Sequence, residues 1–237
     1  ERFAPAEAAE QQVSGLRGVQ ELRALRLNGC PRYPLPIGEV VALADALACL
    51  ASLEVLDIRG NQFGPQGATA LARCLPSLTR VVSLDLALTG LRDDGVALLA
   101  PALRRLTALQ WLKVGSNRIG SKGMEELATC LPSLTGLRTL DLRLNTSIGR
   151  AGAIALARSL VSLTALESLN LSNCGIGGEG AEALVRSFPF LPTLKSLDLG
   201  SCAMGVLGAE ALSQWLPWLP ALVSLKLAAT SSGLLVQ

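Results

Sequence analysis

Aliphatic residues recur along the chain in a nine-residue pattern that ends in a small polar residue. They occupy positions one, four and six, and position nine is Asn, Cys or Thr. The eight copies of the pattern begin at Leu22, Leu53, Val81, Leu109, Leu137, Leu166, Leu194 and Leu222. The intervals between them are 31, 28, 28, 28, 29, 28 and 28 residues. This regular spacing predicts a repeat architecture in which each unit packs against the next.

Each unit is predicted to contain one short strand followed by one helix. At the end of the segment 109–114, apolar and polar residues alternate, which is the period of a strand with one buried face. Later in the same unit, the run from Met124 to Leu134 has the pattern of a helix, with Leu127, Leu131 and Leu134 on one apolar stripe.

The alternation of strands and helices makes every connection a parallel crossover, and such crossovers are almost always right-handed. Helix axes pack about 8–10 Å apart, whereas neighbouring strands lie about 4.7–4.9 Å apart. A stack of such units must therefore curve. The predicted fold is an α/β solenoid, a right-handed horseshoe with a parallel concave sheet, convex helices and about eight repeats of 28 residues.

The repeats are expected to form a single domain over residues 22–230, because no linker interrupts them. Residues 1–21 are predicted to form an N-terminal helix or partial repeat, and residues 231–237 a C-terminal end that is truncated or continues. Neither end carries an obvious cap, and an uncapped solenoid exposes its apolar core. We therefore expect the natural protein to be longer or to be part of a larger complex.

Two further columns of residues are explained by the repeat itself. A glycine lies near the predicted helix start in six units, where we expect close approach of the neighbouring repeat's backbone. These glycines are Gly67, Gly95, Gly123, Gly152, Gly180 and Gly208. The side chains of position nine are expected to form a ladder that hydrogen-bonds backbone groups buried between turns. They are Cys30, Asn61, Thr89, Asn117, Asn145, Cys174, Cys202 and Thr230.

Composition and charge limit the classes of partner. The formal net charge is +2, and acids and bases are mixed without a run of like charges, so we expect no nucleic-acid partner. No apolar run reaches the roughly 18 residues of a membrane-spanning helix, so we expect no membrane partner. The six cysteines show no CxxC pair and no metal-ligand spacing. Three of them fall at position nine, which predicts packed free thiols in a reducing, cytoplasmic compartment.

The sequence offers little for catalysis. It contains no His, which excludes an ordinary catalytic triad and a metalloprotease site, and it has no glycine-rich phosphate loop. Its aspartates lie on a regular open sheet, with nothing to desolvate them. We therefore expect no enzyme and no catalytic, cofactor or metal residues. A GTPase-activating role through one exposed Arg stays open, because it needs a single well-placed side chain.

The concave sheet is the first candidate for a binding surface. If positions one, four and six point inward, positions three, five and seven line this face, and position five carries a broken row of aspartates. Its candidate residues for partner binding are Asp57, Arg59, Asp85, Trp111, Lys113, Asp141, Arg143, Asn170, Asp198 and Lys226. Trp111 is its one aromatic anchor, and interface hot spots favour Trp and Arg. The alternative is that the aspartates only keep the face solvated.

A second candidate surface lies on the convex side, at the C-terminal edge. Phe190 and Trp218 occupy equivalent positions in neighbouring repeats where earlier units carry Ser or Arg, and Trp215 is close by. The change from polar to aromatic side chains predicts an apolar docking patch. Alternatively, these rings pack against surrounding prolines such as Pro189 and Pro217 as a thicker end of the stack.

The pattern LxxLxLxx(N/C)xLxxxGxxxLxxxLxxL, at 28 and 29 residues, resembles the ribonuclease-inhibitor-like class of leucine-rich repeats. Segments 53–61 and 166–174 are close to its consensus, and the resemblance covers residues 16 to about 230. It implies a leucine-rich-repeat solenoid. The class includes ribonuclease inhibitors, the sensing ends of NLR immune proteins, the Ran GTPase-activating protein and structural components of cilia. These proteins bind other proteins, mainly through the concave face or its edge.

The resemblance implies a protein-binding or scaffolding module inside a larger cytoplasmic assembly, with a ciliary or cytoskeletal one as a candidate. Two alternatives stay open: a regulator of enzyme activity, either a GTPase activator or a tight inhibitor, and the ligand-sensing end of an NLR-like immune receptor. The chain carries no GxxxxGK(S/T) loop, so the nucleotide-binding part of such a receptor is absent from it. The partner is expected to be a protein of unspecified identity.

Overall fold

The structure is a computed structural model that describes residues 21–29 and 35–227, over which short strands and helices alternate. The strands are β1 (Ala24–Arg26), β2 (Val55–Asp57), β3 (Ser83–Asp85), β4 (Trp111–Lys113), β5 (Thr139–Asp141), β6 (Ser168–Asn170), β7 (Ser196–Asp198) and β8 (Ser224–Lys226). The helices are α2 (Ile37–Leu47), α3 (Gly64–Cys74), α4 (Arg92–Leu103), α5 (Ser121–Cys130), α6 (Gly149–Leu160), α7 (Gly177–Val185) and α8 (Gly205–Trp215). Four 3₁₀ turns lie between a helix and the next strand: η1 (Leu75–Ser77), η2 (Leu131–Ser133), η3 (Phe188–Phe190) and η4 (Leu216–Trp218).

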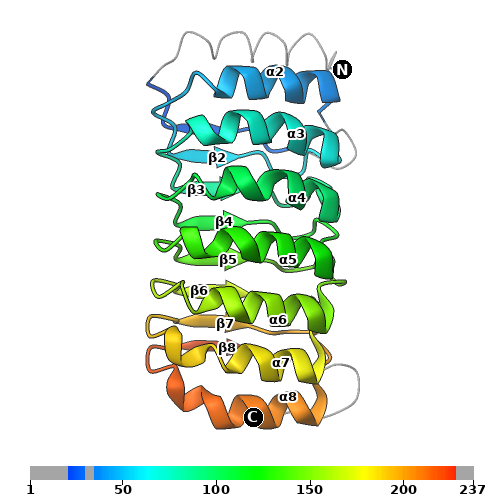
Figure 1. Ribbon diagram of the computed structural model, residues 1–237, viewed down its shortest axis with the longest axis vertical. Helices are drawn as coiled ribbons and strands as arrows, with labels where there is room; N and C mark the ends of the chain where they lie inside the picture. Colours follow the sequence, from blue (N-terminus) through cyan, green and yellow to red (C-terminus); the bar gives the residue numbers. More distant parts are fainter. Residues whose placement is uncertain (1–20, 30–34, 228–237) are drawn as a thin grey trace, which may run out of the picture.

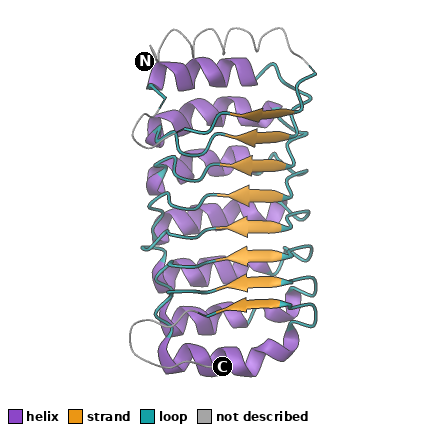
Figure 2. Cartoon of the chain, turned by 180° about the vertical axis from the view of Figure 1, so that it is seen from behind, coloured by secondary structure: helices purple, strands orange, loops and turns teal. Residues whose placement is uncertain are grey.

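The eight strands form one parallel sheet in the order of the chain. Their register aligns the same pattern position in successive units, so that Leu56 pairs with Leu84, and Leu84 with Leu112. The helices form a second layer on one face of this sheet (Figure 1). Figure 2 shows that the helix layer is longer than the strand layer, which places the strands on the inner side of the curve. The predicted α/β solenoid with a concave parallel sheet is confirmed.

The core lies between these two layers and repeats from unit to unit. Positions one, four and six of the fourth unit, Leu109, Leu112 and Val114, are at most 2% exposed. Burying one such side chain contributes about 1.5–3 kcal/mol relative to leaving it in water. Strands of only three residues are too short to be stable alone, so this continuous apolar column holds the stack together.

The helices begin earlier and end sooner than the pattern predicted. The run expected from Met124 to Leu134 is instead α5, Ser121–Cys130, followed by the 3₁₀ turn η2. Pro132 lies in that turn and has no N–H to continue an α-helical ladder, so the chain tightens there. The three leucines of the predicted stripe are nevertheless almost fully buried.

The glycines near the helix starts are enclosed by a side chain of their own unit and by the neighbouring repeat. At all six, the atoms nearest to an added Cβ include the side chain four residues earlier in the same unit. At Gly152, for example, a Cβ would lie 2.7 Å from Ile148 Cγ2 and 3.1 Å from Met124 Cβ. The preceding repeat's backbone is among the nearest atoms only at Gly123 and Gly180. An atom of the neighbouring repeat is among the three nearest at five of the six glycines, so the close approach of that repeat is seen, mostly through a Cβ and beside the apolar side chain of the same unit.

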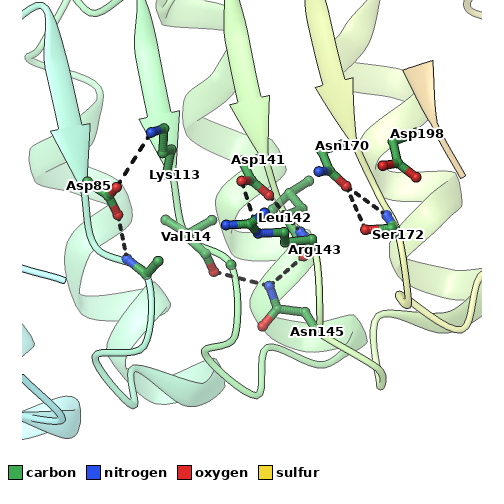
Figure 3. Close-up of polar contacts among 12 residues, drawn as sticks. Asp85, Lys113, Val114, Asp141, Leu142, Arg143, Asn145, Asn170, Ser172 and Asp198 are labelled. Carbon is green, nitrogen blue, oxygen red and sulfur yellow. Dashed lines mark hydrogen bonds and ion pairs between the residues drawn. The ribbon is translucent and has the colours of Figure 1, made fainter. Parts of the chain in front are cut away.

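Position nine forms the expected hydrogen-bond ladder between units. The Asn145 side-chain amide donates to the carbonyls of Val114 at 3.1 Å and Leu142 at 2.7 Å, one in each of two neighbouring units (Figure 3). Its Oδ1 accepts the backbone N–H groups of Asn117 at 2.9 Å and Ile119 at 3.1 Å. Asn117 makes the equivalent contacts one unit earlier. One side-chain amide thus pairs with four buried backbone groups. Without it these groups would lack hydrogen-bond partners, which is energetically costly in the core.

Candidate functional site

In five of the eight units, an Asp or Asn at position five holds the turn that follows the strand. Oδ1 of Asp141 accepts the backbone N–H of Arg143 at 3.1 Å. Asn170 accepts the N–H of Ser172 at 3.0 Å in the same way (Figure 3). The equivalent bond is made by Asp57, Asp85 and Asp198. Because an amide oxygen replaces a carboxylate oxygen at Asn170, the turn requires an acceptor at this position and not a negative charge.

Each aspartate of position five also has a cation beside it. Lys113 Nζ lies 3.7 Å from Asp85 on the neighbouring strand, and Arg143 Nε lies 3.4 Å from Asp141 two residues earlier in the same unit (Figure 3). The two remaining pairs are Asp57 with Arg59 and Asp198 with Lys226. In all four pairs the carboxylate is recessed and the cation is the more exposed partner. The row that the sequence presented as acidic is therefore a row of ion pairs whose outermost groups are positive.

Trp111 rises from the middle of the concave sheet. Its neighbours in the sheet register are Ser83 on β3 and Thr139 on β5, both of which have small side chains. The tryptophan is 38% exposed. Lys113 lies two residues further along β4 and therefore points to the same face. The structure thus places Trp111 and the position-five cation Lys113 on the same face of the sheet.

A second set of ion pairs lies at position two, just before each strand, and was missed by the sequence analysis. Glu167 binds Lys195 Nζ at 2.7 Å and Arg138 Nη1 at 2.5 Å, so one carboxylate joins three successive units. The hydrogen bonds from Lys195 and then Arg138 lower the pKa of Glu167. Arg23 and Glu54 make a similar pair at 3.5 Å in the first two units. Opposite charges at the same pattern position of neighbouring units were the signal that could have found them.

The convex aromatic residues divide into two groups. Phe190 in η3 and Trp218 in η4 are 49% and 58% exposed. Trp215 is partly buried against the core, and its ring centroid lies 6.4 Å from that of Trp218 at an interplanar angle of 39°. Trp215 therefore supports Trp218, while Phe190 and Trp218 present an exposed apolar surface at this end of the stack.

Two grooves lie outside the concave sheet. One, of about 440 Å³, lies between α6 and α7, where Arg150 and Arg186 are paired with Glu179 and Glu182. The other, which we call the loop groove, measures about 630 Å³ and lies where the strands end and the helices begin. Its lining includes Phe63, Leu88, Gly90, Arg92, Ser116 and Arg118. In the first groove two of the three arginines pair with its carboxylates, whereas the lining of the loop groove contains no carboxylate.

The described cysteines are free thiols, four of them buried and Cys49 exposed. Cys174, at position nine, donates from Sγ to the carbonyl of Leu142 at 3.2 Å, and burial raises the pKa of its thiol to about 12. The prediction of packed free thiols is confirmed for the buried four, while Cys30 and Thr230 lie outside the described residues.

Among the side chains described, no cluster of His, Cys, Asp or Glu is placed to hold a metal ion. No helix in the described ranges is both long enough and apolar enough to cross a membrane.

The repeats identified here match a known sequence family. Residues 49–72, 106–128, 134–157, 162–185 and 190–213 match the family described as Leucine Rich repeat, and together they make up half of the chain. The chain belongs to the leucine-rich-repeat family. No curated protein matches the sequence of this leucine-rich-repeat chain.

Two solved structures illustrate the likeness in fold. The tropomodulin C-terminal domain of Caenorhabditis elegans matches with a TM-score of 0.53 at 12% identity, over 66% of this chain and 92% of that one. An internalin of Listeria monocytogenes matches with a TM-score of 0.56 at 20% identity, over 92% of this chain and 64% of the internalin chain. At such low identity, the likeness concerns the leucine-rich-repeat fold alone.

Proposed function

We propose that this leucine-rich-repeat chain is a protein-binding module that holds its partner on the concave sheet, around Trp111. The observation that carries the proposal is the exposure of this large ring between two small neighbours on an otherwise polar face. An exposed tryptophan that needs no place in the core is the kind of side chain that dominates binding energy at protein interfaces.

The charges around Trp111 favour a partner surface with acidic groups. Lys113 lies on the same strand, and Arg143 lies just after the neighbouring strand β5, each more exposed than the aspartate with which it pairs. A partner carboxylate can approach these cations without displacing the hydrogen bond that the Arg143 backbone N–H donates to Asp141. Rim charges of this kind mainly affect the rate and specificity of association.

The wider role that we propose is a scaffold inside a larger assembly, with a fold of the ribonuclease-inhibitor-like class. Units of 28 and 29 residues with a full helix on the convex side support that class. We assign no catalytic role to the aspartates of position five, because each accepts a backbone N–H and lies beside a cation.

Photo-cross-linking tests the proposed face. The photoreactive residue p-benzoylphenylalanine would replace either Trp111 or Glu126, an exposed residue on α5 of the same unit that serves as the matched control. In extract of the source cells, we expect a discrete cross-linked protein from the first site and not from the second. Unlabelled wild-type chain should compete for it, and Trp111→Ala should compete about 30-fold less well or worse, because loss of a hot-spot side chain costs at least about 2 kcal/mol.

Two results would contradict the proposal. One is the same cross-linked species from both positions, which would indicate non-specific capture. The other is a Trp111→Ala chain that competes as well as the wild type, which would place the binding surface elsewhere on the molecule.

A further inference from the structure

The loop groove crosses the loops of three successive units at the edge of the sheet. Phe63 forms a buried part of its floor, and Leu88 contributes an apolar side chain that is 43% exposed. Backbone hydrogen bonds join the loops across the groove, from Gly64 N–H to the Thr89 carbonyl and from Arg92 N–H to the Asn117 carbonyl, both at 2.9 Å. The walls are therefore held in place before any ligand arrives.

Arg92 stands in this groove at a position where five other units place glycine. The equivalent residues are Gly64, Gly120, Gly149, Gly177 and Gly205. Four of these glycines have a left-handed backbone conformation, with φ between 58° and 69°. Arg92 has the same conformation, with φ 56°. This conformation is unfavourable for a residue with a Cβ. The turn thus favours glycine, and the presence of Arg92 calls for an explanation outside the turn itself.

Arg118 and Leu88 also have left-handed backbone, but at positions where the repeat accepts other residues. Arg118 has φ 57°, and the equivalent positions carry Gly90 and Gly175 but also Gln62 and Ala203. Leu88 has φ 58°, and Ser116, Leu144, Asn173 and Ser201 adopt the same conformation at its position. Three exposed side chains, two cationic and one apolar, therefore lie on left-handed backbone around a single groove, and Arg92 is the one that replaces a glycine of the repeat.

The groove is positively charged as well as apolar. In the part of the chain that the structure describes, neither Arg92 nor Arg118 forms an ion pair, and no carboxylate lines the groove. Asp93 follows Arg92, but its Oδ1 accepts the backbone N–H of Gly120 at 2.6 Å. Helix α3 begins at the groove without a side-chain cap or an acidic residue in its first turn, so its positive end adds to the charge, whereas Asp93 and Asp94 in the first turn of α4 offset the positive end of that helix.

We propose that the loop groove binds an extended acidic segment of a partner protein, with carboxylates against Arg92 and Arg118 and an apolar side chain against Leu88. The arginines come from successive loops and present two separate charges, which matches carboxylates spaced along a chain better than one converging phosphate. Neighbouring strands lie about 4.7–4.9 Å apart and an extended chain advances about 3.3–3.6 Å per residue, so partner residues one or two apart can reach both arginines. This surface is separate from the concave face and adds to the proposed function.

Selection from a random peptide display library tests the inference. The library would be selected on the wild-type chain and counter-selected on an Arg92→Gly/Arg118→Gly chain. Both substitutions restore the residue found at equivalent positions, so we expect the variant to melt no lower than the wild type. Enriched peptides should combine Asp or Glu with an apolar residue. Each single Arg→Gly variant should weaken the best peptide about five- to tenfold, and added salt should weaken it further.

Three comparisons make the outcome decisive. Leu88→Ser should also weaken the peptide, because it removes the apolar contact, and Ser116 and Ser201 show that serine is accepted at the equivalent left-handed position. Trp111→Ala should leave peptide binding unchanged, so failure of this inference can be told apart from failure of the concave-face proposal. The inference is overturned by selection of peptides without acidic residues, by no enrichment over the counter-selected chain, or by a phosphoserine version of the best peptide that binds more tightly than the glutamate version.

Discussion

At the scale of single residues, position five has two separate roles that one side chain can fulfil. Oδ1 of Asp141 accepts the N–H of Arg143, and Oδ2 faces the Arg143 guanidinium. Asn170 keeps the first role and lacks the negative charge. The sequence showed that these positions lie on the concave face, but it could not show the hydrogen bond, because an Asp followed by any residue permits other turn geometries.

Substitutions at Asp141 separate the two roles. Asp141→Asn should leave the free energy of unfolding within about 0.5 kcal/mol of wild type, since an exposed ion pair contributes little. Asp141→Ala should lower it by about 0.5–1.5 kcal/mol, because the turn loses its acceptor. Urea unfolding measures both. Asn170→Asp is the matched control in the opposite direction and should be close to neutral. Equal losses for the Asn and Ala variants would mean that the charge, and not the acceptor, holds the turn.

At the scale of the elements, one carboxylate links three consecutive units. Glu167 precedes β6 and binds Lys195, which precedes β7, and Arg138, which precedes β5. The parallel register aligns position two of each unit, so these contacts follow from the repeat once the register is known. Because the folded-state pKa of Glu167 is lowered, its contribution to stability is present above the unfolded pKa and is lost as pH falls through the folded pKa.

NMR titration of the Glu167 carboxyl group checks this link. We expect its midpoint below the ordinary Glu value of about 4.3. Lys195→Ala should raise the midpoint most and Arg138→Ala should also raise it, in the order of their effects on this group. Lys226→Ala is the control, because Lys226 pairs with Asp198 on the same face and should leave the Glu167 midpoint unchanged. A midpoint that does not respond to Lys195→Ala would show that the pair is not formed in solution.

The strands were predicted well and the loops were not, for a physical reason. Positions such as Leu112 belong to the core in every unit, so apolar periodicity locates the strands directly. The loop groove depends instead on left-handed backbone at Leu88, Arg92 and Arg118, which are residues that seldom adopt it. The column of glycines equivalent to Arg92 was present in the sequence, but its meaning required the φ angles.

At the scale of the whole molecule, stability depends on how many neighbours each unit has. β5 is paired on both sides, by β4 and β6, whereas in the described chain β8 is paired only by β7. The repeat spacing predicted this linear order, since no unit contacts any but adjacent ones in such a stack. The spacing alone did not show how the side chains of one unit meet those of the next. The concave face around Trp111 and the loop groove both arise from these contacts between units.

Matched leucine substitutions test this linear picture. Leu140 on β5 is fully buried, and Leu225 occupies the same pattern position on β8 but is only partly buried. Leu140→Ala should lower the free energy of unfolding by about 2–5 kcal/mol, through lost burial and a cavity enclosed by two neighbouring units. Leu225→Ala should cost clearly less, because its cavity is open on one side and fewer atoms lose contact. Hydrogen exchange should show faster opening near the C-terminal units for Leu225→Ala, and faster opening across the central units for Leu140→Ala. Equal losses at the two sites, with the same exchange pattern, would mean that the units unfold as one indivisible body and not as neighbours in a row.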